Sequence, residues 1–176
     1  MIETKSTYFE RPEDQIAPTL SHGGKNLLIV YHSKTGKTER LADAVYEGAN
    51  DALFETVSVT MKTAQEAGPK DLIESHGLLL GTPENFGYMS GAMKDFLDRT
   101  FYEVEGKIQP LPYATFISAG NDGSGALRAI RRIANGYPFQ EVQEPVIVVG
   151  DPTPDDLDRC KELGMALGAG IDADIY

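Results

Sequence analysis

The stretch YHSKTGKT, residues 31–38, combines hydroxyl side chains, a glycine and lysines, which are groups that bind phosphate in proteins. It follows an apolar run, KNLLIV, and precedes an amphipathic stretch, ERLADAVYEGA, so it should connect a strand to a helix. Such a loop places free backbone amides at a helix N-terminus, where an anion is favoured. The pattern therefore predicts a phosphate-binding loop, and the alternative is an ordinary strand–helix turn capped by threonine. Its residues are Ser33, Lys34, Thr35, Gly36, Lys37 and Thr38.

The same stretch could be the end of the nucleoside-triphosphate motif G-x-x-x-x-G-K-[ST]. That alignment places Tyr31 at the position of the motif's first glycine. The first glycine lets the loop wrap a phosphate with positive φ, a conformation that tyrosine adopts only with strain. Three hydroxyls around Gly36 suit one terminal phosphate instead. The pattern therefore favours a monophosphate over a triphosphate.

Two further segments could surround a planar ligand. One is TPENFG, residues 82–87, and the other is SAGNDGSGA, residues 118–126; each follows an apolar run. In the first, Phe86 supplies a flat face while Glu84 and Asn85 supply polar edges, and a planar heterocycle needs both. The glycines of the second allow the backbone to approach a ligand closely, although such turns are common without one. Its G-N-D-G-S-G spacing is the reverse of the dinucleotide fingerprint G-x-G-x-x-G.

Apolar runs and helical spacing predict five strands that alternate with helices. Short buried strands in this pattern are typical of an open parallel sheet covered on both faces. In such a sheet ligands bind beyond the carboxyl ends of the strands, where the winding direction reverses, so the three loops should meet there. The expected strands are 27–31, 56–61, 77–81, 114–118 and 145–150, and the expected helical segments are 41–49, 70–75, 89–101, 126–134 and 157–167.

The overall charge limits the class of partner. The chain has 176 residues, of which 27 are acidic and 16 basic, for a formal net charge of −11. This balance opposes binding to nucleic acid or to an anionic membrane surface, because both need clustered lysine and arginine. No apolar run approaches the roughly 20 residues that cross a bilayer. We expect a soluble protein, or one with a basic partner.

The cellular compartment and the domain boundaries can be inferred from the cysteine, the histidines and the N-terminal sequence. Cys160 is the single cysteine, which fits a reducing compartment, and with three scattered histidines it offers no zinc-like spacing. The N-terminus lacks the basic start and apolar middle of a signal peptide. We expect a cytoplasmic protein with an N-terminal arm over residues 1–25, flexible or laid on a neighbouring subunit, and one domain over residues 26–176.

Taken together, these loops resemble those of the flavodoxin-like superfamily. LIVYHSKTGKTERLADAVYEGA is similar to its FMN-phosphate motif, and GTPENFGYMSGAMKDFLDRT is similar to the second-loop motif of its NAD(P)H-dependent FMN and quinone reductase branch. The resemblance begins near residue 26 and implies a three-layer, doubly wound α/β sandwich with a five-stranded parallel sheet in the order 2-1-3-4-5. It also implies non-covalent FMN, with NAD(P)H as co-substrate. The flavin would supply the redox chemistry, so no catalytic side chain and no metal are expected.

The resemblance assigns cofactor contacts to each loop. The first loop would hold the phosphate, the second would line the isoalloxazine ring, and the third would close the other side. The chain departs from the branch in having Asn85 where an arginine often stands, in a shorter third loop, and in having no tryptophan. The implied residues are Ser33, Lys34, Thr35, Gly36, Lys37 and Thr38 in the first loop, Thr82, Pro83, Glu84, Asn85, Phe86 and Gly87 in the second, and Ser118, Ala119, Gly120 and Gly123 in the third.

Three functions remain open at this point. The first is a reductase that passes electrons from NAD(P)H through FMN to flavin or a quinone-like acceptor. The second is a one-electron carrier that docks on a basic redox partner protein, and the third is a flavodoxin-like scaffold with weak or no FMN binding. The identity of the acceptor and the oligomeric state, a homodimer or tetramer included, are not fixed by the sequence.

Three other segments have alternative interpretations. TFYEVEGKIQPLPY, residues 100–113, could be an extra hairpin, a wall of the acceptor site or a subunit contact. The arginines of ALRAIRRIA, residues 126–134, could form a solvated helix face or could bind the phosphate of a nicotinamide cofactor. The GMALGAG run near the C-terminus is assigned no cofactor role, because no βαβ unit follows it.

Overall fold

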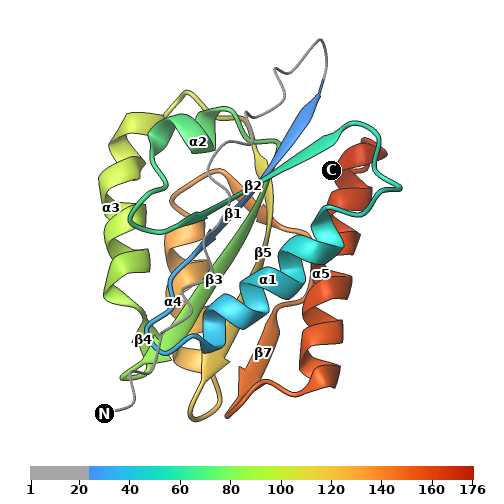
Figure 1. Ribbon diagram of the computed structural model, residues 1–176. Helices are drawn as coiled ribbons and strands as arrows, with labels where there is room; N and C mark the ends of the chain where they lie inside the picture. The colour runs from blue at the N-terminus through green and yellow to red at the C-terminus, as the bar shows by residue number, and fades with distance from the viewer. Residues whose placement is uncertain (1–23) are drawn as a thin grey trace, which may run out of the picture.

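The computed structural model describes residues 24–176, which form an α/β fold around one largely parallel sheet (Figure 1). The strands lie in the order β2-β1-β3-β5-β6, and β7 also pairs with β5. The predicted doubly wound topology is confirmed, with β6 and β7 together in the place of the fifth strand. The bounds are β1 Lys25–Tyr31, β2 Val57–Thr63, β3 Gly77–Asn85, β4 Tyr88–Met89, β5 Leu111–Ala119, β6 Phe139–Glu141 and β7 Val146–Val149.

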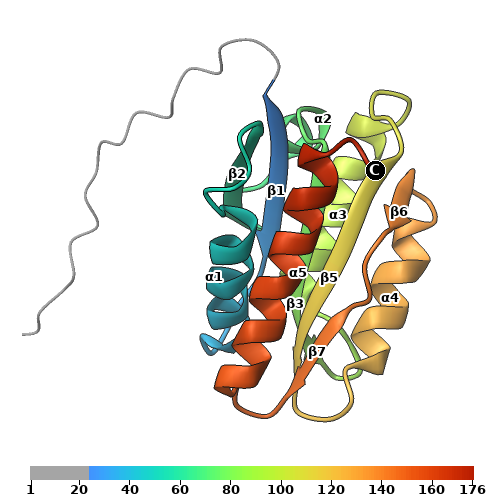
Figure 2. The ribbon, with the colours of Figure 1, turned by 90° about the vertical axis from the view of Figure 1, so that its right-hand side faces the viewer.

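Helices cover both faces of the sheet (Figure 2). The helices α1 and α5 pack on one face, and α2, α3 and α4 pack on the other. In β1, Leu28 and Val30 join the second of these clusters while Leu27 and Ile29 join the first, as expected for a strand buried on both faces. The bounds are α1 Lys37–Ala49, α2 Pro69–Ile73, α3 Gly91–Val104, α4 Ser124–Ala134 and α5 Pro154–Asp172.

The position of the fifth strand is filled by two short pieces. β6 pairs with the beginning of β5 and β7 pairs with its end, both in parallel. Pro145 lies between them, and proline has no backbone N–H to give to a sheet. The strand expected over residues 145–150 is therefore β7, whereas β6 was not predicted.

Glycines allow α1 and α5 to pack with their backbones in contact, and the two helices lie side by side in Figure 2. A Cβ added to Gly164 would lie 2.0 Å from the carbonyl oxygen of Val45, and one added to Gly48 would lie 1.9 Å from that of Lys161. The GMALGAG run lies inside α5. Its first glycine, Gly164, is thus accounted for by helix packing.

Two local expectations differ from the structure. The connector 100–113 contains no extra hairpin, because α3 continues to Val104 and β5 begins at Leu111. Met89 was expected at the start of a helical face but lies in β4, and α3 begins two residues later with Ser90 as its N-cap.

The arm expected over residues 1–25 lies outside the described residues except for its last two positions, and Lys25 begins β1.

None of the helices over residues 24–176 is both long and apolar enough to cross a membrane. In the same part of the chain, no group of three or more histidine, cysteine, aspartate and glutamate side chains is arranged to hold a metal ion.

Candidate functional site

The carboxyl ends of β1, β3 and β5 bring the three predicted loops to one edge of the sheet, beside the first turns of α1 and α4 (Figure 1). The pairing of β1 with β3 extends to Tyr31 and Gly81, and that of β3 with β5 extends to Pro83 and Ser118. We call residues 32–38 the first loop, 82–88 the second loop and 118–123 the third loop. Their meeting point is the edge at which an open parallel sheet binds ligands.

The first loop exposes unpaired backbone amides at the N-terminus of α1. Gly36 has φ 85°, a value that favours glycine, and its N–H donates to Ser33 Oγ at 3.1 Å. No side chain caps this helix, and no group of residues 24–176 accepts from the N–H of Thr35, Lys37 or Thr38. Free amides at a helix start, with the positive end of the helix dipole, make a binding site for an anion.

Thr38 connects the first loop to the third. Its side chain is buried, and its Oγ1 lies 2.8 Å from the Oγ of Ser118, which is also buried at the end of β5. This hydrogen bond spans 80 residues of sequence. The two predicted site residues are therefore adjacent, and they hold the start of α1 against the third loop.

The two lysines of the first loop differ in what they contact. Lys37 Nζ donates to the carbonyl of Gly150 at 3.1 Å and forms an ion pair with Asp151 at 2.7 Å. The hydrogen bond from Lys37, and then its charge, lower the pKa of the exposed Asp151 carboxyl. Lys37 can thus offer its backbone amide to an anion, while its side chain faces the loop before α5. Lys34 is exposed and forms no ion pair within residues 24–176, so its charge remains at the rim.

The second loop is a tight β-hairpin with an aromatic ring at its tip. Phe86 has φ 52° and Gly87 has φ 70°, and Asn85 pairs with Tyr88 across the turn. Positive φ at both central residues corresponds to a type I′ turn, which is costly for a bulky residue such as phenylalanine. The Phe86 side chain is fully exposed, with a relative accessibility of 108%. Strained residues often cluster at functional sites, and Phe86 offers a flat apolar face to a ligand.

Glu84 ties the second loop to the third. Its carboxylate accepts from the backbone N–H groups of Gly123 at 3.2 Å, Gly125 at 2.9 Å and Ala126 at 3.2 Å. These amides form the N-terminus of α4, so a negative side chain is favoured there by the helix dipole. A Cβ added to Gly125 would lie 2.0 Å from the carbonyl oxygen of Gly87, so the hairpin also packs directly on this helix.

The remaining predicted residues lie in the same loops but differ in exposure. Thr82 is buried, and its hydroxyl accepts from the N–H of Ser90 at 2.9 Å, which fixes the start of α3. Pro83 and Asn85 are partly buried, and Ala119 is buried at the end of β5. A Cβ built on Gly120 would meet no atom within 4 Å. The backbone of the third loop is therefore accessible at Gly120, whereas a direct side-chain contact from Thr82 stays a prediction.

Sequence reasoning missed Gly125 and the role of Glu84 as an acceptor for α4. Gly125 has a weak signal, because a second glycine just inside a predicted helix suggests close packing. The Glu84 contact joins residues about 40 positions apart and has no local signal. Both residues position the loops and need not touch a ligand.

The arrangement provides an anion site at α1, an exposed aromatic hairpin and an open glycine turn side by side. A model of the flavodoxin family matches residues 29–162. The chain belongs to the flavodoxin family. The flavodoxin of Aquifex aeolicus is 28% identical over 161 residues, which cover 82% of this chain and 86% of the relative. The NAD(P)H dehydrogenase (quinone) of Acidithiobacillus ferrooxidans is 33% identical over 118 residues, which cover 56% of this chain and 59% of that relative.

Solved structures show the same fold. A flavodoxin from the domain Archaea superposes with a TM-score of 0.70 at 24% identity, covering 83% of this family member and 98% of that chain. A WrbA-like flavodoxin from Agrobacterium tumefaciens superposes with a TM-score of 0.70 at 20% identity, covering 85% and 99%. Rubredoxin oxygen:oxidoreductase from Desulfovibrio gigas, with a TM-score of 0.73 at 18% identity, is matched over 86% of this chain but only 37% of its own length. At these identities the likeness concerns the fold alone.

Proposed function

We propose that this flavodoxin-family protein binds FMN at the three loops and uses it to transfer electrons. When bound, FMN would supply the redox chemistry, which no side chain of the site can perform. The residues fit the group: the phosphate tail is a dianion that suits the free amides of the first loop, and the ring system is a flat heterocycle that suits Phe86 and the open third loop.

Each loop would have a separate task. The hydroxyls of Ser33 and Thr35 and the amides of the α1 N-terminus would hold the phosphate. Phe86 would cover part of the ring, and backbone amides of the second and third loops would stabilise negative charge on the reduced ring. The hydrogen bonds of Thr38 with Ser118 and of Glu84 with α4 would fix the positions of the three loops relative to one another.

One observation supports the proposal more than any other. The unpaired N-terminal amides of α1 lie beside the Thr38–Ser118 hydrogen bond, which joins them to the glycine-rich third loop. An anion site on its own would suit many phosphorylated ligands. An anion site that adjoins an exposed aromatic hairpin and an open backbone turn suits a ligand with one phosphate and one flat ring system.

Titration of the purified protein with FMN, followed by flavin absorbance and fluorescence, tests this proposal. Riboflavin is the matched ligand, because it has the same ring and lacks the phosphate. Thr35→Val removes one hydroxyl from the first loop, and we expect a loss of about 1–3 kcal/mol in FMN affinity. Riboflavin affinity should not change. The control is Thr60→Val, at an exposed position on β2 outside the loops.

Two results would contradict the proposal. The first is the absence of a flavin spectral change with FMN, which would favour the scaffold function. The second is a Thr35→Val variant that binds FMN as tightly as the wild type does, or that loses as much affinity for riboflavin as for FMN. In either case the phosphate would lie elsewhere.

We further propose that NAD(P)H supplies the electrons and that flavin or a quinone-like compound accepts them. This rests on the second-loop stretch GTPENFGYMSGAMK and on the relative described as an NAD(P)H dehydrogenase (quinone). Anaerobic stopped-flow mixing of the FMN-loaded protein with NADPH and with NADH should bleach the flavin at a rate that saturates with nucleotide. An absence of bleaching with both would contradict the reductase function.

A one-electron carrier is the second candidate function. The net charge of −11 suits docking on a basic partner protein, and the relative from Aquifex aeolicus, which matches most of the chain, is described as a flavodoxin. A carrier would bind FMN and exchange electrons with a partner protein while remaining oxidised in NADPH and NADH.

The cytoplasmic location and the oligomeric state stay predictions, which cell fractionation and light scattering would test.

A further inference from the structure

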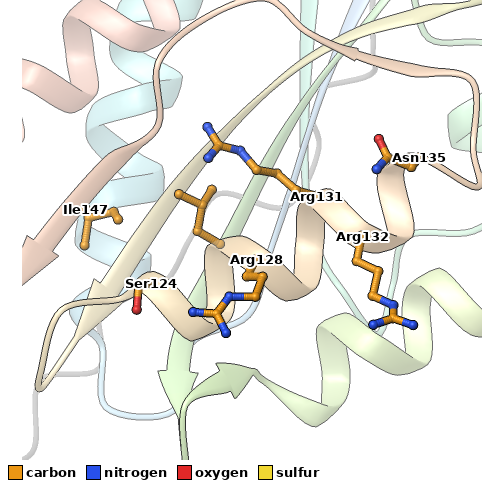
Figure 3. Close-up of a pocket in the computed structure, with 7 residues that line it drawn as sticks. Ser124, Arg128, Arg131, Arg132, Asn135 and Ile147 are labelled. Atoms are coloured by element: carbon orange, nitrogen blue, oxygen red, sulfur yellow. The ribbon is translucent and has the colours of Figure 1, made fainter.

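An open hollow of about 590 Å³ lies along α4, next to the third loop (Figure 3). Its volume is within the range of small-molecule sites. One end begins at Ser124, the residue that follows Gly123 of the third loop. The hollow is lined by Ser124, Leu127, Arg128, Arg131, Arg132, Asn135 and Ile147.

The lining combines an apolar floor with a cationic rim. Leu127 and Ile147 pack on the small apolar cluster under the third loop. Figure 3 shows the side chains of Arg128 and Arg132 on one side of the helix and that of Arg131 on the other. An apolar floor with arginines at its rim suits a ligand that carries both a ring or ribose and anionic groups.

Two of the three arginines have no hydrogen-bonded partner in the part of the chain that the structure describes. Arg131 is paired, because its Nε donates to both carboxylate oxygens of Glu141, at 3.1 and 2.8 Å. The guanidinium groups of Arg128 and Arg132 form no hydrogen bond or ion pair within residues 24–176. The pKa of the nearby Asp122 carboxyl is lowered first by hydrogen bonds from Ser124 and then, more weakly, by the charge of Arg128. The nearby Asp122 carboxylate is occupied by the backbone N–H and hydroxyl of Ser124.

Arg128 and Arg132 add positive charge to α4 in a chain with a formal net charge of −11, where acidic residues outnumber basic ones by 27 to 16. The helix dipole gives a structural reason for Arg131 and Arg132, which lie in the last turn of α4. It gives none for Arg128, which lies near the middle of α4. Charge complementarity therefore favours an anionic ligand.

The position of the hollow narrows the class of ligand. From Ser124 to Arg132 the helix rises on the order of 12 Å. A ligand with one end at the proposed flavin site and its phosphates at these arginines must therefore be extended and polyanionic. A nicotinamide dinucleotide has this form, with the nicotinamide ring at one end, a pyrophosphate in the middle and, in NADP(H), a third phosphate on the adenosine ribose.

We propose that the α4 hollow binds the phosphates of the nicotinamide dinucleotide, with Arg128 and Arg132 as the phosphate ligands. This inference rests on the proposed reductase function, and it assigns to α4 the nucleotide site that such a reductase needs. The planar guanidinium groups can each form two parallel hydrogen bonds to a phosphate, and they stay charged at any pH of interest. Because NADP(H) has one phosphate more than NAD(H), the hollow should favour NADP(H).

Calorimetric binding of NADP⁺ to the FMN-loaded protein tests the site without turnover. The variants are Arg128→Gln, Arg132→Gln and the double variant. Lys70→Gln is the control, because it removes one positive charge from α2 at a side chain that is 84% exposed. We expect each arginine variant to weaken NADP⁺ binding roughly 10-fold and the double variant roughly 100-fold. Lys70→Gln should bind NADP⁺ as the wild type does.

A ligand without phosphate separates contacts to the phosphates from contacts to the nicotinamide ring. Nicotinamide riboside has the ring and the ribose but no phosphate, so its binding should be unchanged in the arginine variants. FMN affinity and the unfolding midpoint should also be unchanged, which excludes a damaged fold. NADP⁺ binding that is undetectable at millimolar concentration, or equal in wild type and double variant, would overturn the inference. So would an arginine effect confined to electron transfer with an acidic protein acceptor.

Stopped-flow reduction separates this inference from the reductase function on which it rests. If NADPH bleaches the flavin with the same concentration dependence in wild type and double variant, the protein is a reductase and the α4 site is wrong. If NADPH bleaches the flavin in neither the wild type nor the double variant, but NADP⁺ binding still depends on Arg128 and Arg132, the site is supported and the reductase function is wrong.

Discussion

Replacing Glu84 separates two roles that one carboxylate in the second loop could have. The sequence places Glu84 at the edge of the flavin ring, whereas the structure shows it bound to the N-terminus of α4 through three backbone N–H groups, at 2.9–3.2 Å. If the second role dominates, removing the carboxylate should destabilise the protein in the absence of FMN.

The size of this effect follows from the contacts. Hydrogen bonds to a charged group contribute about 1.5–3 kcal/mol each, and the helix dipole adds about 0.3–1 kcal/mol. The three bonds share one carboxylate that is only partly buried, and two of them are 3.2 Å long, so together they contribute less than three separate bonds and water can replace part of what is lost. We expect Glu84→Ala to lower the free energy of unfolding by about 2–4 kcal/mol. Glu84→Gln keeps one neutral acceptor oxygen and should cost about 1–2 kcal/mol.

Urea denaturation of the FMN-free protein, followed by circular dichroism, measures this loss. Glu74→Gln on the exposed surface is the control and should change the free energy by no more than about 0.5 kcal/mol. A Glu84→Ala protein as stable as this control would refute the reasoning. If Glu84→Gln instead weakened FMN binding with no change in stability, the carboxylate would act on the ring and not on the helix.

Three further outcomes are expected. Gly164→Ala should lower the free energy of unfolding by about 1–3 kcal/mol in urea, because its Cβ would overlap a carbonyl of α1, whereas Gly91→Ala, which meets no atom within 4 Å, should be neutral or stabilising. Burial raises the pKa of the Cys160 thiol to about 12, so a thiol reagent should modify it in guanidinium but not in the native protein at mildly alkaline pH. Burial, and then the charge of a neighbouring lysine, lower the pKa of His32 below 6.5. The unfolded chain therefore binds more protons just below that pH, and the free energy of unfolding should fall as the pH is lowered there, less so in His32→Asn.

The arrangement of the sheet could be predicted because its signals are local. The apolar runs of β1, β3 and β5 are long enough to indicate buried strands, and the handedness of their crossovers limits the order in which they pair. β6 could not be found in this way, because Phe139–Glu141 has a single apolar residue and is a strand only through its pairing with β5.

The hairpin of the second loop shows a different limit. Met89 and Met93 are four residues apart, so an apolar helical spacing extends back into β4 by coincidence. Type I′ turns usually contain asparagine and glycine, and a phenylalanine with positive φ is too rare to expect. The loop residues could be named from the sequence, whereas the contacts of Lys37 with Asp151 and of Glu84 with α4 depend on how distant segments pack.

The break between β6 and β7 bears on how the protein avoids self-aggregation. An unbroken outer strand offers a row of free backbone donors and acceptors to which a strand of another molecule can add. On this side of the sheet the row is divided into pieces of three and four residues, with Pro145 in the interval. An incoming strand would gain few hydrogen bonds there, so the interruption protects the molecule from growth by intermolecular strand addition.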